Sequence, residues 1–193
     1  MMIKIYPGVK GLIFDCDGTL VDSMPLHMKA WKRAFNDFGE DCPDKFLNPL
    51  KGMHEEEIVE LYNERFNKNI DSRRLVELKH RCFQEDLADV KPIKPVVDIV
   101  MKYHVDYPMA VVSGGTFRNV SRALEIAGII NYFKVILTAD DPIRPKPAPD
   151  IFIEAAKRIN VEPGFCQVFE DGELGLKAAE QAGMYLTDIR DYI

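Results

Sequence analysis

Two aspartates separated by one residue follow an apolar run near the start of the chain. Residues 11–14 read GLIF, which is typical of a buried strand of a parallel sheet, and Asp15 and Asp17 come directly after them. Because residues two apart on a strand point to the same face, the two carboxylates are expected to project together. Adjacent anions are unfavourable unless a cation joins them or one stays protonated. The spacing therefore predicts an anionic site at a strand end, where open α/β sheets bind ligands.

Polar residues also follow two later strand-like runs. Ser113 and Gly114 lie between an apolar run and a predicted helix, and a hydroxyl with the amides of a glycine turn can bind phosphate oxygens. Lys146 lies in a proline-rich loop, and the prolines fix the backbone that presents its ammonium group. Taken singly, these features also suit an ordinary strand-to-helix turn and an ordinary surface lysine.

Two adjacent acids, Glu170 and Asp171, end the apolar run 166–169. Carboxylates are the ligands that a hard cation such as Mg²⁺ prefers. The same pair also suits the N-terminus of a helix, where the dipole favours negative charge. The residues therefore leave a cation site and a plain helix start both open.

The apolar pattern changes character at about residue 92. Helical stripes are expected at residues 25–38, around 58–66 and at 75–87, whereas the chain after residue 95 alternates between short strands and helices of about ten residues. This alternation predicts an α/β fold with a Rossmann-like parallel sheet. The predicted organisation is an α/β core made of residues 1–21 and 93–193, interrupted by a helical domain at residues 22–92.

The composition limits the possible partners and compartments. The chain has 193 residues, is 47% hydrophobic and carries a net charge of −6, which argues against a nucleic-acid partner. The sequence contains no apolar run long enough to cross a bilayer, so no membrane partner is expected. The four cysteines show no metal-binding spacing, and two of them lie in apolar strand-like runs, as buried thiols do. We expect a cytoplasmic, monomeric protein.

The polar segments, taken together, resemble the four motifs of the haloacid dehalogenase (HAD) superfamily. Residues 14–23, FDCDGTLVDS, are similar to the first motif, and Ser113, Lys146 and the Glu170-Asp171 pair follow in the family's order. Residues 169–184 look like the form found in the subgroup of β-phosphoglucomutase and small sugar phosphatases, although Gly172 stands where that subgroup usually has Ser or Ala. The resemblance spans essentially the entire chain. It implies a HAD-like core, with residues 22–92 as an α-helical cap domain.

The resemblance also implies a chemistry for the two aspartates. Asp15 would be the nucleophile that forms an aspartyl-phosphate, and Asp17 would be the general acid and base. The implied Mg²⁺ ligands are Asp15, the backbone carbonyl of Asp17, Asp171 and Glu170, with Glu170 either on the ion or behind its ligands.

The same resemblance implies which residues bind the substrate. Ser113, Gly114 and Lys146 would bind the phosphate oxygens. In the cap, His27 resembles a hinge histidine that helps to position Asp17, and the family sometimes has a substrate-binding lysine where Lys79 stands. Lys79 shares the apolar stripe of its helix, so it either extends to solvent or faces the active-site cleft.

The leading prediction is a Mg²⁺-dependent phosphatase acting on a small phosphorylated sugar or sugar acid. Residues 27–31 and 186–190 look most like the bacterial fructose-1-phosphate/6-phosphogluconate phosphatase branch. The alternative is a β-phosphoglucomutase. The mutases carry a cap arginine where an ungapped count places Glu55, and an acid there would repel a second phosphate, although a shifted alignment could recruit Arg65 or Arg81. A catalytically silent binding protein on the same fold is a third possibility, since a fold alone does not prove activity.

Overall fold

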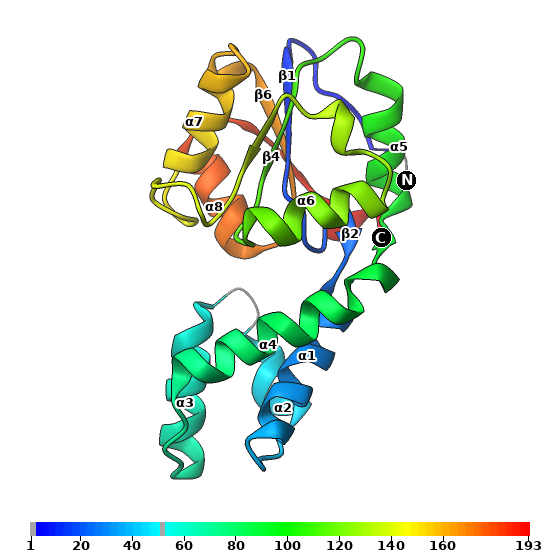
Figure 1. Ribbon diagram of the computed structural model, residues 1–193. Coiled ribbons are helices and arrows are strands. Elements are labelled where there is room, and N and C mark those ends of the chain that lie inside the picture. The colour runs from blue at the N-terminus through cyan, green and yellow to red at the C-terminus, as the bar shows by residue number, and fades with distance from the viewer. Residues whose placement is uncertain (1–2, 51–52) are drawn as a thin grey trace. The chain divides into compact units, whose positions relative to one another are not determined.

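The computed structural model describes residues 3–50 and 53–193, which form two compact units. One unit contains the chain up to Asp22 and again from Val90 onward, and it holds the sheet (Figure 1). The other unit, Ser23–Asp89, is helical. The chain thus leaves the α/β unit after its first strand and returns to it about seventy residues later.

The α/β unit is built on a five-stranded sheet in which every neighbouring pair is parallel. Its strands are β1 (Gly11–Phe14), β4 (Met109–Val112), β5 (Val135–Leu137), β6 (Cys166–Glu170) and β7 (Tyr185–Asp188). The strand order is β5-β4-β1-β6-β7, so β1 lies at the centre. The parallel sheet predicted from the alternating pattern is confirmed.

Four helices cover the sheet. They are α5 (Lys94–Tyr103), α6 (Phe117–Ile126), α7 (Asp150–Arg158) and α8 (Glu173–Gln181), and the short 3₁₀ turns are η3 (Ile130–Tyr132), η4 (Pro163–Phe165) and η5 (Ile189–Asp191). Helices α7 and α8 lie on one face, with α5 and α6 on the other (Figure 1). From β1 the chain proceeds through β4 to β5 at one edge of the sheet, and then crosses to β6 and β7 on the other side of β1. Because such crossovers are right-handed, the helices that accompany these two directions lie on opposite faces of the sheet. The order reverses at β1, which is where such sheets open a ligand-binding crevice.

The sheet is buried on both faces. Every residue of β1, β4 and β6 is buried, as expected for strands that read as continuous apolar runs. On one face the rings of Phe14 and Phe169 stack with centroids 4.6 Å apart. On the other, Ile13 and Val112 belong to an apolar cluster with Phe152 of α7. All four cysteines are free, buried thiols, as the sequence predicted for two of them.

A two-stranded antiparallel ribbon lies where the chain leaves and re-enters the α/β unit. It consists of β2 (Val21–Asp22) and β3 (Lys91–Pro92), with Val21 opposite Pro92. Two residues per strand are too few to show a period, so the pairing could not be read from the pattern.

The helical unit contains α1 (Met24–Asp37), α2 (Asp44–Leu47), α3 (Glu55–Phe66) and α4 (Ser72–Asp86), with 3₁₀ turns η1 (Asn48–Leu50) and η2 (Leu87–Asp89). The helical character expected from the stripes is confirmed. Helix α2 was not predicted, because four residues are about one turn and show no stripe.

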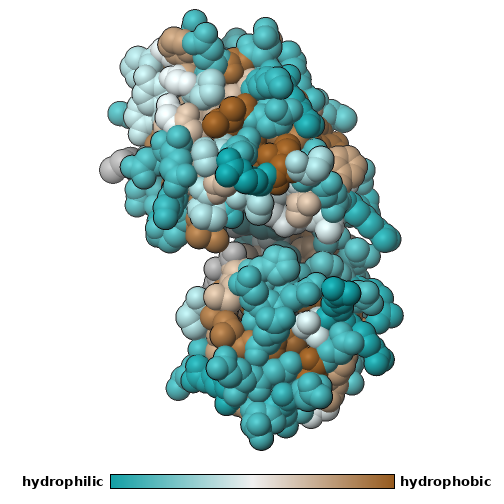
Figure 2. Space-filling model, turned by 90° about the vertical axis from the view of Figure 1, so that its left-hand side faces the viewer, coloured by the Kyte–Doolittle hydropathy of each residue, from teal (hydrophilic) through white to brown (hydrophobic). Residues whose placement is uncertain are grey.

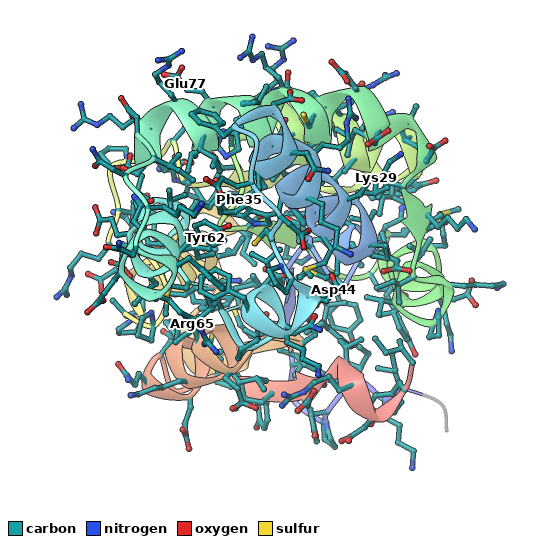
Figure 3. All side chains as sticks on the ribbon, turned by 90° about the horizontal axis from the view of Figure 1, so that it is seen from below. Lys29, Phe35, Asp44, Tyr62, Arg65 and Glu77 are labelled. Atoms are coloured by element: carbon teal, nitrogen blue, oxygen red, sulfur yellow. The ribbon has the colours of Figure 1, made fainter. Side chains whose placement is uncertain are left out.

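Aromatic side chains fill the interior of the helical unit. The rings of Phe35 and Tyr62 lie 4.3 Å apart, and Figure 3 shows both among the helices, with Lys29 and Glu77 at the outside. The Tyr62 hydroxyl donates a hydrogen bond of 2.9 Å to the carbonyl of Asp41, which satisfies its polar end. Hydrophilic residues cover most of the face shown in Figure 2. Within residues 3–50 and 53–193, no helix combines the length and apolar character needed to span a membrane.

Candidate active site

Seven of the predicted site residues, including Gly114 directly after Ser113, belong to four segments at the carboxyl edge of the sheet. Asp15 and Asp17 follow β1, Ser113 follows β4, and Glu170 and Asp171 lie at the end of β6. The loop after β5 carries Lys146. Because the carboxyl ends of parallel strands meet at one edge, segments far apart in the chain converge here.

The Lys146 ammonium group joins three of these segments. Its Nζ lies 2.6 Å from Asp15 Oδ1, 2.6 Å from Glu170 Oε2 and 3.2 Å from the carbonyl oxygen of Val112. An ammonium group has three hydrogens to donate, and these three acceptors can use them all. The side chains of Asp15 and Glu170 are less than one-tenth exposed, so these are buried ion pairs rather than surface contacts.

Three carboxylates form a cluster that could hold a metal ion. Asp15, Glu170 and Asp171 each offer an oxygen, and these oxygens lie within 4.8 Å of one another. The Thr19 hydroxyl donates a hydrogen bond of 3.0 Å to Asp171 Oδ1. The sequence-predicted acids are thus brought together, and the arrangement suits a hard cation bound by oxygen. The side chain of Asp17 is not part of this cluster, so its expected role as a ligand through the backbone carbonyl stays a prediction.

The cluster carries more negative charge than its one lysine balances. Burial raises the pKa of the Asp15 carboxyl well above its ordinary value, and the Glu170 carboxylate raises it further against the opposing charge of Lys146. Burial would lower the pKa of Lys146, but the charges of Asp15 and Glu170 outweigh it and raise that pKa. Burial and Glu170 also raise the pKa of Asp171, against the hydrogen bond from Thr19. The lysine is therefore charged, and the remaining negative charge favours either binding of a further cation or protonation of one carboxyl group.

Asp17 is paired with the loop after β4. The Ser113 hydroxyl donates a hydrogen bond of 3.2 Å to Asp17 Oδ2, and it accepts one of 3.0 Å from the backbone N–H of Gly115. The Ser113 N–H itself donates to the carbonyl of Leu137 in β5. Ser113 is therefore fixed between the acid and the neighbouring strand.

A tight turn begins at Cys16, directly after Asp15, and contains Asp17. Strand β1 ends at Phe14, and the Cys16 carbonyl accepts backbone hydrogen bonds from residues 19–21. The Asp15 N–H still donates a hydrogen bond to the Phe169 carbonyl of β6, and the shared face that strand alternation predicts for Asp15 and Asp17 stays a prediction. Gly18 has φ +89°, and a Cβ there would lie 2.3 Å from Asp171 Oδ2. Glycine is required on both counts.

Gly114 lies in the same loop as Ser113. Among the residues that the structure describes, other than Gly114 and its two chain neighbours, no atom lies within 4 Å of the place that a Cβ on Gly114 would occupy. The space at Gly114 is therefore open, and the role predicted for this turn in binding phosphate stays a prediction.

His27 and Lys79 lie in the helical unit, where they contact each other. Lys79 Nζ lies 3.1 Å from His27 Nδ1 and pairs with Glu55, whose other oxygen pairs with His80. The His27 ring stacks on Phe83 at 4.0 Å. Burial alone would raise the pKa of the Glu55 carboxyl, but hydrogen bonds from His80 and Lys79 lower it to about 2. With 2% of its side chain exposed, Lys79 does not extend to solvent, so that alternative is wrong.

Thr19 is a site residue that sequence reasoning left without a role. It is fully buried, and it orients Asp171 across a separation of 152 residues in the chain. The available signal was its place in the aspartate-rich first segment, directly after the turn glycine. Its partner depends on how β1 and β6 pair, which the residue pattern alone does not specify.

The class of protein follows from the fold, the four strand-end segments and the family comparison. The chain belongs to the haloacid dehalogenase-like hydrolases, whose family model matches residues 12–188. A HAD hydrolase of family IA from Entamoeba histolytica has the same fold, with a TM-score of 0.83 at 24% identity over 96% of this chain and 86% of that one.

Two curated relatives show where in this class the chain falls. It is 35% identical to the fructose-1-phosphate phosphatase YqaB of Escherichia coli, over 96% of this chain and 99% of that protein. It is 29% identical to the β-phosphoglucomutase of Bacillus subtilis, over 94% of this chain and 83% of that protein. The resemblance to the β-phosphoglucomutase-like subgroup and its phosphatase branch is confirmed, and the chain is a HAD hydrolase.

Proposed function

We propose that this chain is a Mg²⁺-dependent phosphatase that hydrolyses a small sugar phosphate through an aspartyl-phosphate on Asp15. The observation that carries the proposal is the placement of Asp15. It is buried at the central strand end, held by Lys146 at 2.6 Å, and it belongs to the carboxylate cluster. The similarity to a fructose-1-phosphate phosphatase supports the same reaction class.

The proposed reaction has two steps. In the first, an Asp15 oxygen forms a bond to phosphorus while the bond from phosphorus to the sugar oxygen breaks, and protonated Asp17 gives its proton to that leaving oxygen. In the second, Asp17 takes a proton from water as the water oxygen bonds to phosphorus, and the Asp15–phosphorus bond breaks. The hydrogen bond from Ser113 to Asp17 fixes the carboxyl that must carry this proton.

The residues present fit a divalent cation. Three carboxylates lie near a single lysine, and burial, with the neighbouring Glu170 charge second, raises the pKa values of Asp15 and Asp171. Asp15, Asp171 and the backbone carbonyl of Asp17 are the proposed ligands. A bound Mg²⁺ would reduce the repulsion between the carboxylate nucleophile and an anionic phosphate.

Ser113, Gly114 and Lys146 are the proposed phosphate-binding residues. Lys146 brings a positive charge beside the attacking oxygen, where it can stabilise the charge on the transferred group. The opening beside Gly114 offers space for a phosphate oxygen close to the Ser113 hydroxyl.

We assign the choice of sugar to the helical unit, through His27 and Lys79. Lys79 is buried and His27 is half-buried, and their side chains contact each other at 3.1 Å beside Glu55. A buried charged group costs stability unless it is paired, so buried Lys79 depends on its contacts with His27 and Glu55.

Product identification tests the proposal. The protein is incubated with Mg²⁺ and a panel of fructose 1-phosphate, 6-phosphogluconate and β-glucose 1-phosphate with a trace of the bisphosphate, and inorganic phosphate and glucose 6-phosphate are both measured. Release of phosphate from a sugar, abolished by EDTA and by Asp15→Asn, is the expected result. Glucose 6-phosphate without net phosphate would show a mutase instead.

A further inference from the structure

A glycine in the first turn of α8 lies against the side chain of Glu170. Gly175 is buried, and a Cβ built on it would lie 2.0 Å from Glu170 Oε2, 2.2 Å from Cδ and 2.7 Å from Cγ. All three distances are below the 3.0 Å at which one of the two groups has to shift. The Glu170 side chain therefore occupies the space that any other residue at position 175 would fill.

The Glu170 carboxylate is not free to move out of this space. Its Oε2 accepts a hydrogen bond from Lys146 at 2.6 Å, and its Oε1 accepts one from the N–H of Gly172 at 2.9 Å. Its backbone is held in β6, opposite Asp188 of β7. With 3% of the residue exposed, displacement would leave a buried carboxylate and a buried ammonium group without these partners.

We propose that Gly175 is a positioning residue of the site, because its missing side chain lets Glu170 hold Lys146 against Asp15. Gly175 acts on the reaction only through Glu170 and Lys146. Its effect on turnover rests on the proposed phosphatase function, whereas the steric relationship with Glu170 does not. The proposal also gives Glu170 the role of a support for the lysine, since both of its carboxylate oxygens accept hydrogen bonds from protein groups.

A double-mutant cycle tests this inference. Gly175→Ala is made in the wild-type chain and in the Glu170→Ala chain, and kcat, KM for fructose 1-phosphate and the thermal midpoint are measured for all four proteins. In the wild-type chain we expect Gly175→Ala to lower kcat about 100-fold, the usual consequence of displacing a positioned group by about 1 Å, and to lower the midpoint. In the Glu170→Ala chain the same change should leave kcat unchanged and raise the midpoint, because alanine favours a helix and fills the vacated space.

Gly164→Ala is the matched control. Gly164 lies in η4 at the opposite edge of the sheet. Apart from its two chain neighbours, no residue that the structure describes has an atom within 4 Å of the place its Cβ would occupy, so activity and midpoint should stay at wild-type values. A Gly175→Ala effect of equal size in both backgrounds would mean ordinary helix packing and would overturn the inference, as would full activity in the single variant. If Gly175→Ala alone does not fold, the inference requires that the double variant does. If the wild type releases no phosphate, the proposed function fails. The thermal midpoints of the four proteins then still show whether a side chain at position 175 clashes with Glu170.

Discussion

The Lys146 ammonium lies 2.6 Å from an oxygen of Asp15, although 131 residues separate the two in the chain. The contact exists because β5 and β1 are separated by one strand, so the loop after β5 returns across the end of β4 to reach the centre of the sheet. Val112, the last residue of β4, accepts the third hydrogen bond from the same ammonium group. The lysine is therefore fixed by three strands at once, and this geometry underlies the predictions that follow.

Replacing Lys146 by methionine should separate the effect of its charge on activity from the effect of its size. Lys146→Met keeps the length of the side chain and removes the ammonium group, so the charge on the transferring phosphoryl group loses its nearest protein cation. We expect kcat/KM to fall by about 100- to 1,000-fold, the range found when one preorganised donor is removed. Phosphate release by purified variants measures this. Lys157→Met, on the exposed side of α7, is the control and should retain full activity. An active Lys146→Met enzyme would contradict the role given to this residue.

Removing the Thr19 hydroxyl should weaken metal binding without changing the shape of the site. Thr19→Val is isosteric and deletes the donor to Asp171, and loss of such a supporting hydrogen bond usually costs about 10- to 100-fold in metal affinity. The measurement is Mg²⁺ binding by calorimetry. Thr138→Val is the matched control, because Thr138 is also buried and its hydroxyl bonds Asp141, which lies outside the cluster. Equal affinities for the two variants would rule out this role for Thr19.

The charge imbalance of the cluster predicts how stability depends on pH. Because burial and Glu170 raise the pKa of Asp15, its contribution to stability is fully present below the pKa of the unfolded chain and is lost as the pH rises through the folded pKa. The Asp15→Asn variant has a neutral side chain at this position. Without metal, its free energy of unfolding at about pH 8 should therefore exceed that of the wild type by on the order of 1 kcal/mol, and this difference should become smaller toward about pH 5. Thermal melts in EDTA measure this.

Magnesium provides the control for the same variant. Added Mg²⁺ should raise the midpoint of the wild type more than that of Asp15→Asn, since the variant has lost a ligand. A metal-free variant that is less stable than the wild type at every pH would show that the three carboxylates do not repel one another as we infer.

The lysine of the helical unit gives a prediction about substrate choice. Lys79→Met keeps the apolar stem beside Trp31 and Phe83 but removes the group that pairs with His27 and Glu55. We expect KM for sugar phosphates to rise about tenfold, the worth of one hydrogen bond to a charged group, while turnover of a small aryl phosphate is unchanged. Equal losses on both substrates would point to a structural role instead.

Much of the site could be predicted from residue order, for a physical reason. Asp15, Ser113 and Glu170 each follow an apolar run, and parallel strands bring their carboxyl ends to one edge whatever the details of packing. By contrast, the hydrogen bond from Thr19 to Asp171 and the space that Gly175 leaves for Glu170 depend on strand pairing and on how α8 lies against β6. Neither has a periodic signal in the sequence.

The turn after β1 also could not be predicted from the sequence pattern. The apolar run predicts the strand at residues 11–14, as the structure shows, but it does not predict the path of the chain after the strand. Residues 19–21 all donate backbone hydrogen bonds to the Cys16 carbonyl, and such a turn has no period to detect.

Covalent capture on Asp15 tests the central claim most directly. Asp17→Asn protein is mixed with Mg²⁺ and an aryl phosphate, whose leaving group needs no proton, then quenched in acid and digested for mass analysis. Because the variant lacks the base that activates water, we predict that the peptide containing Asp15 gains the mass of one phosphoryl group, and that the Asp15→Asn, Asp17→Asn double variant does not. Phosphate release by the wild type with no adduct on Asp15 in the variant, or with an adduct on another residue, would contradict the account.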